Sequence, residues 1–183
     1  MAYIVSQTDI QTIQQHEKEV YVKIDLLNKK FQTIDSLTGN LISDNLNVSS
    51  ESKQRRTYSC DLVLTDASFL IGYDKKIWID KYIRPYYGIK NIRSGEIVWW
   101  KIGVFTYNDV SYTYSGTEKQ LSLSCIDLMG DYDGTKNGQI SGYDLKIPAG
   151  EKIYSTIIAL MNSAGIEKYN IENTDLELSL IHI

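Results

Sequence analysis

Alternation of apolar and polar residues along several stretches constrains the fold of this chain more than any other feature. A two-residue period places successive side chains on opposite faces of a β-strand, so each strand has one apolar and one wet face. The apolar positions of the two clearest stretches are Val20, Val22, Ile24, Leu26 and Tyr58, Cys60, Leu62, Leu64. Composition agrees with a β-rich fold, because the 183 residues include 14 tyrosines and only 2 prolines, and aromatic residues suit half-buried pleated surfaces.

The most hydrophobic stretch, Glu96–Thr106, predicts a strand with two apolar faces. Its apolar residues are Ile97, Trp99 and Phe105 on one face and Val98, Trp100, Ile102 and Val104 on the other. Both faces need cover, which either the core or another subunit must supply.

Other strands and one hairpin complete an antiparallel meander. The further predicted strands are 82–91 and 121–125, with weaker signals at 32–37 and 41–49. Pro85 predicts an edge position or a bulge, because proline cannot donate to a β-ladder. Asn91–Gly95 predicts a hairpin turn with a positive φ at Gly95.

Helical spacing appears near the carboxyl end. The recurring apolar positions are Ile153, Thr156, Ile157, Leu160, Met161 and Ala164, which predicts an amphipathic helix over about 151–164. A shorter helical turn is expected over Thr8–His16, capped by Thr8 or Asp9. The glycine-rich stretch Gly130–Gly142 is the expected boundary between a β-rich domain, 1–142, and the start of a second domain, 143–177.

Charge and composition restrict the classes of partner. The formal net charge is −4 and the isoelectric point about 5.2, which argues against nucleic-acid binding. No apolar run approaches the roughly 20 residues of a membrane-spanning helix, and no secretory signal is recognised, so we expect synthesis in a cytoplasm. The two cysteines, Cys60 and Cys125, are expected in the core.

One loop has the spacing of a calcium site. Its residues are Asp133, Thr135, Asn137, Gly138, Ile140, Ser141 and Asp144, with oxygen ligands at loop positions 1, 3, 5, 9 and 12 and glycine at 6. A threonine at position 3, an aspartate at position 12 and no exiting helix favour a surface loop over calcium. We therefore predict no metal and no cofactor.

No catalytic constellation is recognised. The chain has two histidines, His16 and His182, and neither is expected beside a nucleophile. Carboxylates gather at Asp127, Asp131 and Asp133, but a glycosidase needs a measured separation across a cleft. We predict no catalytic residue.

Aromatic residues offer a different kind of site. Those that could stack on sugars are Tyr86, Tyr87, Trp99, Trp100, Tyr107, Tyr112 and Tyr114. Some of them must fill the core, and the remainder suit a subunit interface enriched in Tyr and Trp. An interface is favoured, and a carbohydrate-binding module remains the alternative.

The run from Arg55 to Gly150 resembles a family of phage and prophage tail proteins of Gram-positive bacteria, related in plan to baseplate hub proteins. The segments that carry the resemblance are RRTYSCDLVLTDASFLIG, KIWIDKYIRPYYGIKN, GEIVWWKIGVFTYNDVSYTYS, LSLSCIDLMGDYDGTKNGQISG and KIPAG. The resemblance implies barrel-like β domains in a ring that connects the tail tube to the tip, with no catalytic residues.

We therefore expect a mainly β (α+β) fold, antiparallel and barrel-like or sandwich-like, that serves as a virion tail component. Expected partners are further copies in a ring-forming homo-oligomer and other tail proteins, the tail tube and the distal or tip proteins, with assembly in the host cytoplasm. A carbohydrate-binding module and a cell-wall-degrading tail enzyme are the alternatives.

The last six residues, Leu178–Ile183, read LSLIHI. They match the product of one reading frame of a common sequencing adapter, so we expect a non-native tail on a truncated protein. A native alternating strand is the alternative.

Overall fold

The computed structural model describes residues 4–37, 41–64, 70–114, 116, 119–131, 147–163, 169 and 171–177. The chain forms two compact units, one comprising Ile4–Gly130 and one that includes Asp131–Ile183. No helix in these described ranges is both long and apolar enough to cross a membrane.

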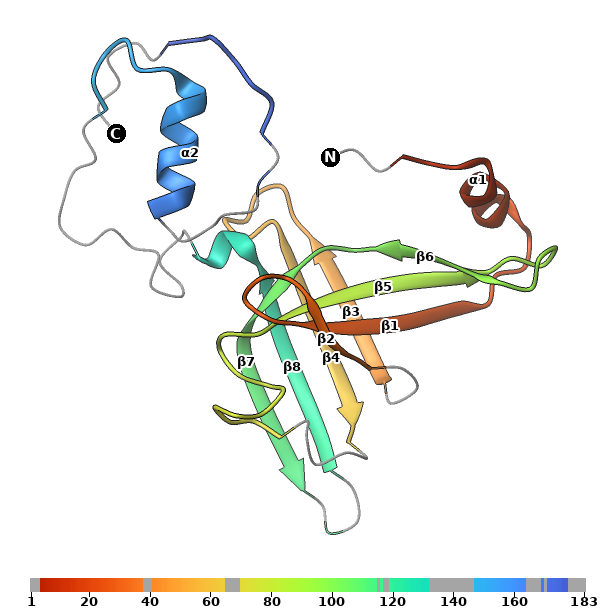
Figure 1. Cartoon of the computed structure of the whole chain (residues 1–183). Coiled ribbons are helices and arrows are strands. Elements are labelled where there is room, and N and C mark those ends of the chain that lie inside the picture. The colour runs from red at the N-terminus through yellow and green to blue at the C-terminus, as the bar shows by residue number, and fades with distance from the viewer. Residues whose placement is uncertain are drawn as a thin grey trace. The chain divides into compact units, whose positions relative to one another are not determined.

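The first unit is one antiparallel sheet of eight strands, preceded by a short helix (Figure 1). Its elements are α1 (Gln7–Gln14), β1 (Val20–Leu27), β2 (Thr33–Leu37), β3 (Leu41–Val48), β4 (Arg56–Val63), β5 (Tyr82–Lys90), β6 (Ile97–Lys101), β7 (Phe105–Tyr114) and β8 (Lys119–Asp127). A 3₁₀ turn, Leu128–Asp131, follows β8. The strand order is β2-β1-β5-β7-β8-β4-β3, and β6 pairs with β5 beside this path. The predicted mainly β, antiparallel class is confirmed, and within the described residues the sheet is open and not a closed barrel.

The sheet has two halves that share one core. They are joined where β5 pairs with the start of β7 over only two positions, Tyr82 with Thr106 and Ile83 with Phe105. Figure 1 shows β1 and β5 running across the direction of β4 and β8. Apolar residues from both halves form the core cluster, among them Ile24, Leu26, Tyr58, Cys60, Leu62, Ile83, Phe105, Leu121, Leu123 and Cys125. The members from β1, β4 and β8 belong to the inward sets that the alternation predicts, but Val20, also predicted to face inward, is 61% exposed.

The predicted single strand over Glu96–Thr106 is wrong, because the chain turns a corner at 102–104 between β6 and β7. Arg56 fixes this corner: its Nη1 donates to the carbonyl oxygen of Ile102 at 2.8 Å. A Cβ on Gly103 would lie 2.7 Å from the same Nη1, so a larger residue there would displace the guanidinium.

The predicted edge or bulge position for Pro85 is also wrong, since β5 is paired on both sides. Pro85 lies between the stretch of β5 that pairs with β7 and the stretch that pairs with β6. Its carbonyl accepts from the amide of Ile102 at 3.0 Å, at the corner. A missing N–H therefore breaks no regular ladder at this point.

The hairpin prediction is confirmed. Gly95 has φ +73°, and the amide of Asn91 donates to the carbonyl of Glu96 at 2.8 Å. The Asn91 side-chain oxygen accepts from the amides of Arg93 and Ser94 at 2.9 and 3.1 Å. This side chain fixes the turn as an Asx-type turn does.

Helix α1 packs against this hairpin. Its N-cap is Ser6 in a reciprocal capping box with Asp9, not Thr8 or Asp9 as predicted, because the Ser6 hydroxyl accepts from the Asp9 amide. The side-chain Nδ2 of Asn91 donates to Oγ1 of Thr12 at 2.7 Å, and Gln15 Nε2 donates to the carbonyl of Lys90 at 2.6 Å.

The second unit contains helix α2 (Ile153–Ser163), which confirms the helix predicted over about 151–164. The amide of Ile153 donates to the carbonyl of Leu176 at 3.0 Å, and Lys152 and Glu177 form an isolated antiparallel bridge. The predicted calcium loop, the 142/143 boundary and the tail 178–183 lie outside the described residues.

One hydrogen bond links the edge strand β3 to β5 in the other half of the sheet. The Tyr87 hydroxyl donates to Oδ2 of Asp44 at 2.6 Å. Burial, together with this bond and the nearby Asp44 charge, raises the pKa of Tyr87 well above its ordinary value. The phenol therefore remains a neutral donor to the carboxylate.

We expect Tyr87→Phe to lower the free energy of unfolding by about 1.5 to 3 kcal/mol, because hydrogen bonds to charged groups contribute this much. Urea denaturation followed by circular dichroism measures the change. Tyr114→Phe is the control: its exposed hydroxyl donates to the carbonyl of Gly116, two residues away, so we expect less than about 0.5 kcal/mol. Equal stabilities of the two variants would contradict a cross-sheet role for Tyr87.

Candidate functional site

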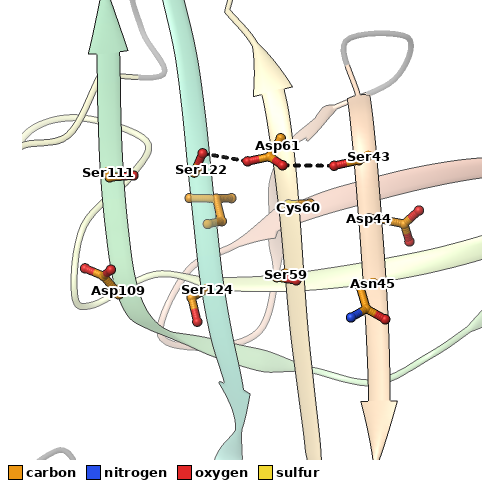
Figure 2. Close-up of a pocket in the computed structure, with 11 residues that line it drawn as sticks. Ser43, Asp44, Asn45, Ser59, Cys60, Asp61, Asp109, Ser111, Ser122 and Ser124 are labelled. Carbon is orange, nitrogen blue, oxygen red and sulfur yellow. Dashed lines mark hydrogen bonds between the residues drawn. The ribbon is translucent and has the colours of Figure 1, made fainter.

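Short polar side chains line a hollow on the outer face of the half-sheet β7-β8-β4-β3 (Figure 2). The hollow has a volume of about 450 Å³. Its lining residues are Ser43, Asp44, Asn45, Ser59, Cys60, Asp61, Asp109, Ser111, Ser122, Leu123 and Ser124. All of them lie within the four strands.

The strand register arranges the outward residues in two rows that run across the strands. Each of the four strands contributes one residue to each row. The first row is Ser111, Ser122, Asp61, Ser43 and the second is Asp109, Ser124, Ser59, Asn45. The residues between the rows, such as Cys60 and Leu123, turn inward to the core. The hollow thus lies where the outward side chains are short.

Asp61 is the anchor of the first row. Its carboxylate accepts from the Ser122 hydroxyl at 2.5 Å and from the Ser43 hydroxyl at 2.9 Å. Hydrogen bonds from Ser122, then from Ser43, hold the pKa of Asp61 below its ordinary value, since they stabilise the charged form. Asp61 is therefore ionised at neutral pH, and its lowered pKa makes it a weak general base.

The chemistry of the lining residues suits binding. Histidine, lysine and arginine are absent from the lining, so Ser122 has a carboxylate beside it but no second base to form a catalytic triad. Serine, asparagine and aspartate supply hydrogen-bond donors and acceptors. Within the described ranges, no three His, Cys, Asp or Glu side chains gather as metal ligands would.

Of the described residues that were considered for catalysis, Cys60 lines the hollow, and His16 and Asp127 do not. His16 is exposed just after α1, while His182 and Asp133 lie outside the described residues. Asp127 is buried and has a structural role, because its carboxylate accepts hydrogen bonds from the backbone amides of Arg56 and Met129 at 2.8 and 3.0 Å. Of the groups that the structure describes, the exposed His16 and the buried Asp127 do not form a common site.

Both cysteines are core residues, as predicted. Burial, and then the nearby charges of Asp44 and Asp61, raise the pKa of the Cys60 thiol to about 12. A thiol with so high a pKa is almost wholly protonated near neutral pH and is a poor nucleophile.

The aromatic residues considered for sugar stacking do not share one surface. Tyr86 and Tyr107 are buried, and Tyr87 bonds to Asp44. Trp99 and Trp100 are half-buried and lie on opposite faces of β6, opposite Gly88 and Tyr87 of β5.

Sequence reasoning found part of the hollow and missed the rest. The alternation places Ser59 and Asp61 on the wet face of one strand and Ser122 and Ser124 on that of another. It gives no pairing between strands, so it does not predict the two rows. The signal present in the sequence is that the side chains at the wet positions of these strands are unusually short.

No family model and no curated protein sequence matches the chain. Among solved structures, it is similar to "Structure of PdpA-VgrG Complex, Lidless", with a TM-score of 0.39 and 10% identity over 79% of this chain and 24% of that chain. It is also similar to "Structure of Francisella PdpA-VgrG Complex, half-lidded", with a TM-score of 0.37 and 13% identity over 74% of this chain and 20% of that chain. The chain thus spans about a quarter or less of the chains it matches.

We expect Ser122→Ala to raise the pKa of Asp61, because the variant removes the strongest hydrogen bond to its carboxylate. A lowered pKa means that Asp61 stabilises the folded state above its unfolded pKa. This stabilisation is lost as the pH falls through the pKa of the folded state. Between neutral and acid pH, the variant should therefore lose less stability than the unaltered protein. Carboxyl carbon NMR titration measures the pKa directly. Ser124→Ala, on the same strand and face, should leave it unchanged; a similar shift in both variants would contradict the assignment.

Neither native thiol should react with iodoacetamide at pH 8 within minutes, whereas unfolding in urea should expose two per chain, as the sequence contains. Mass spectrometry of the labelled protein counts the modified cysteines. Ser124→Cys provides the control, since this exposed position should label in the folded protein. If Cys60 in the folded protein is labelled as fast as that control, its burial in the core would be contradicted.

Proposed function

We propose that this protein is a structural component of a bacteriophage or prophage tail, a baseplate-hub or tail-tip ring subunit that links the tail tube to the tip. It acts by assembly and is not an enzyme. The assignment to tails is supported by the five sequence segments that resemble this family. The assembly role is supported by the geometry of β6.

Strand β6 is the observation that carries the assembly role. It pairs with β5 on one side only, and no partner strand is found for its other side in the described residues. Ile97, Val98, Trp99 and Trp100 are each only half-buried. Four consecutive large apolar residues on an edge strand form the kind of surface that a subunit interface covers, and tryptophan is enriched in such interfaces.

Other exposed apolar residues support the same role. Val20, at the start of β1, and Ile92, in the β5–β6 hairpin, are 61% and 64% exposed, and Ile42 and Val48 on the edge strand β3 are 57% and 66% exposed. Single exposed apolar side chains are ordinary. Their position at the ends and edges of the sheet makes them available to neighbouring molecules.

On this proposal, the partners are further copies of the chain and adjoining tail proteins, and the protein resides in the virion tail after assembly in the host cytoplasm. The hollow of Figure 2 supports a binding role, because it supplies hydrogen-bonding groups and its lining contains no histidine or lysine to act as a base beside Ser122.

Sedimentation velocity over a range of concentrations tests the assembly role. We expect the unaltered chain to self-associate and Val98→Lys to weaken that association at least about tenfold, since an edge lysine opposes both apolar contact and strand addition. Ile79→Lys is the control: Ile79 is 74% exposed in the segment between β4 and β5, away from β6. Circular dichroism verifies that both variants fold.

A chain that remains monomeric at high concentration and binds neither tail-tube nor tip proteins would refute the proposal. The location is tested separately by gold-labelled antibodies on particles induced from the bacterium that encodes the protein. Label at the tail tip is expected, and label absent from the particles would refute the virion location.

A further inference from the structure

We propose that the outer face of the half-sheet β7-β8-β4-β3 binds a neutral polyhydroxylated ligand, a glycan chain, in the hollow formed by its two polar rows. This site is distinct from the aromatic residues of β6, and the inference does not depend on the tail assignment.

The composition of the two rows conflicts with the secondary structure that carries them. All eight outward positions are serine, aspartate or asparagine; aspartate and asparagine are depleted in strands, and serine does not share the β preference of threonine or valine. A merely solvated sheet face is ordinarily built from threonine and from long polar side chains that cover the backbone. Residue types that disfavour the local secondary structure are expected at functional positions.

The two rows differ in how their hydrogen-bonding groups are used. In the first row, Asp61 accepts from Ser122 and Ser43, so this row is largely satisfied internally. The second row is Asp109, Ser124, Ser59 and Asn45, and within the described part of the chain none of these side chains makes a hydrogen bond. The first row stiffens the surface while the second presents free groups to a ligand.

The free groups match hydroxyls better than other ligand groups. Asp109 only accepts, Asn45 both donates and accepts through its amide, and each serine hydroxyl does both. A sugar hydroxyl also donates and accepts, so a row of hydroxyls can satisfy this sequence of groups across four strands.

Charge and polarity oppose anionic ligands and apolar partners. The carboxylates of Asp61 and Asp109 line the hollow without a basic residue, which opposes phosphate, sulfate and anionic polymers. An apolar protein surface docked here would leave the free groups unpaired, at a cost of about 1 to 3 kcal/mol for each buried group. The volume of about 450 Å³ lies within the roughly 300 to 1,000 Å³ of ligand sites.

Isothermal titration calorimetry and ¹H–¹⁵N NMR of the full chain test the proposal. The probes are neutral hexasaccharides of β1,4-linked glucose, α1,4-linked glucose and β1,4-linked N-acetylglucosamine, together with a sulfated glucose hexamer. We expect at least one neutral probe to bind and to shift the amides of Ser59 and Ser124. The sulfated probe should bind at least about tenfold more weakly.

Two variants locate the site. Asp109→Ala combined with Ser124→Ala should weaken binding by about tenfold or more, the equivalent of about 1.4 kcal/mol, and Ser59→Arg should abolish it by filling the hollow. All three positions are exposed, so folding is expected to persist. Thr113→Ala combined with Asn47→Ala is the control, since both residues are exposed, on β7 and β3 of the same half-sheet, and neither lines the hollow.

The outcomes separate this site from the aromatic residues of β6. Trp100→Ala should leave binding unchanged. No binding by any neutral probe, binding that survives both hollow variants, or amide shifts centred on β6 would each overturn the proposal. None of these measurements depends on self-association or on the location in a virion.

Discussion

The corner at 102–104 is the constraint on which the rest of the sheet depends. Here the chain leaves the half-sheet that contains β6 and enters the half-sheet that contains β7. Arg56 secures it three ways: its guanidinium donates to the carbonyl of Ile102, the same group lies 5.7 Å from the centre of the Phe105 ring, and its backbone amide donates to Asp127 at the end of β8. Arg56 is therefore a structural brace, and the Ile102 carbonyl and the Phe105 ring stabilise its charge.

Several features follow from this corner. Strand β7 departs from β5 after two paired positions, and among the described residues β6 has β5 as its one strand neighbour. Pro85 is accommodated in the interior of the sheet because it lies opposite the interruption. The freed β7 pairs along its whole length with β8, which creates the broad outer face that carries the hollow. The apolar edge and the polar face thus have a common structural origin.

Local sequence patterns predicted the strands and their faces well where the period was regular. In β4 and β8 the alternation correctly separated Cys60 and Cys125 from Asp61 and Ser122, because one buried face imposes the register on each strand. The β5–β6 hairpin was predictable for an equally local reason, since Asn91 and Gly95 supply the turn chemistry. The corner was not predictable, because its cause is a contact between Arg56 and Ile102, 46 residues apart.

The bulge in β7 shows why the candidate site was also beyond local reasoning. Tyr107 pairs with Cys125, and Asp109 pairs with Ser124, so one extra residue is inserted between them. Without it, the two-residue period would place Asp109 on the core side with Phe105 and Tyr107, and would turn Val110 and Tyr112 outward. The bulge instead moves Asp109 to the outer face and returns Val110 and Tyr112 to the core side, where they pack against the cluster. A sequence pattern read strand by strand does not reveal such a shift.

The two proposed surfaces have opposite physical requirements, and this separates their roles. Covering the half-buried tryptophans of β6 removes apolar area from water, which stabilises an assembly at about 25 cal/mol for each Å² buried. Covering the row of Asp109, Ser124, Ser59 and Asn45 with an apolar partner would instead remove free polar groups from water without replacing their hydrogen bonds. Only a partner that returns those bonds can occupy the polar face without a net penalty. The polar hollow is therefore suited to a hydrated, hydroxyl-rich ligand, while the apolar edge of β6 is suited to another protein, and one sheet can present both because its corner directs them onto different halves.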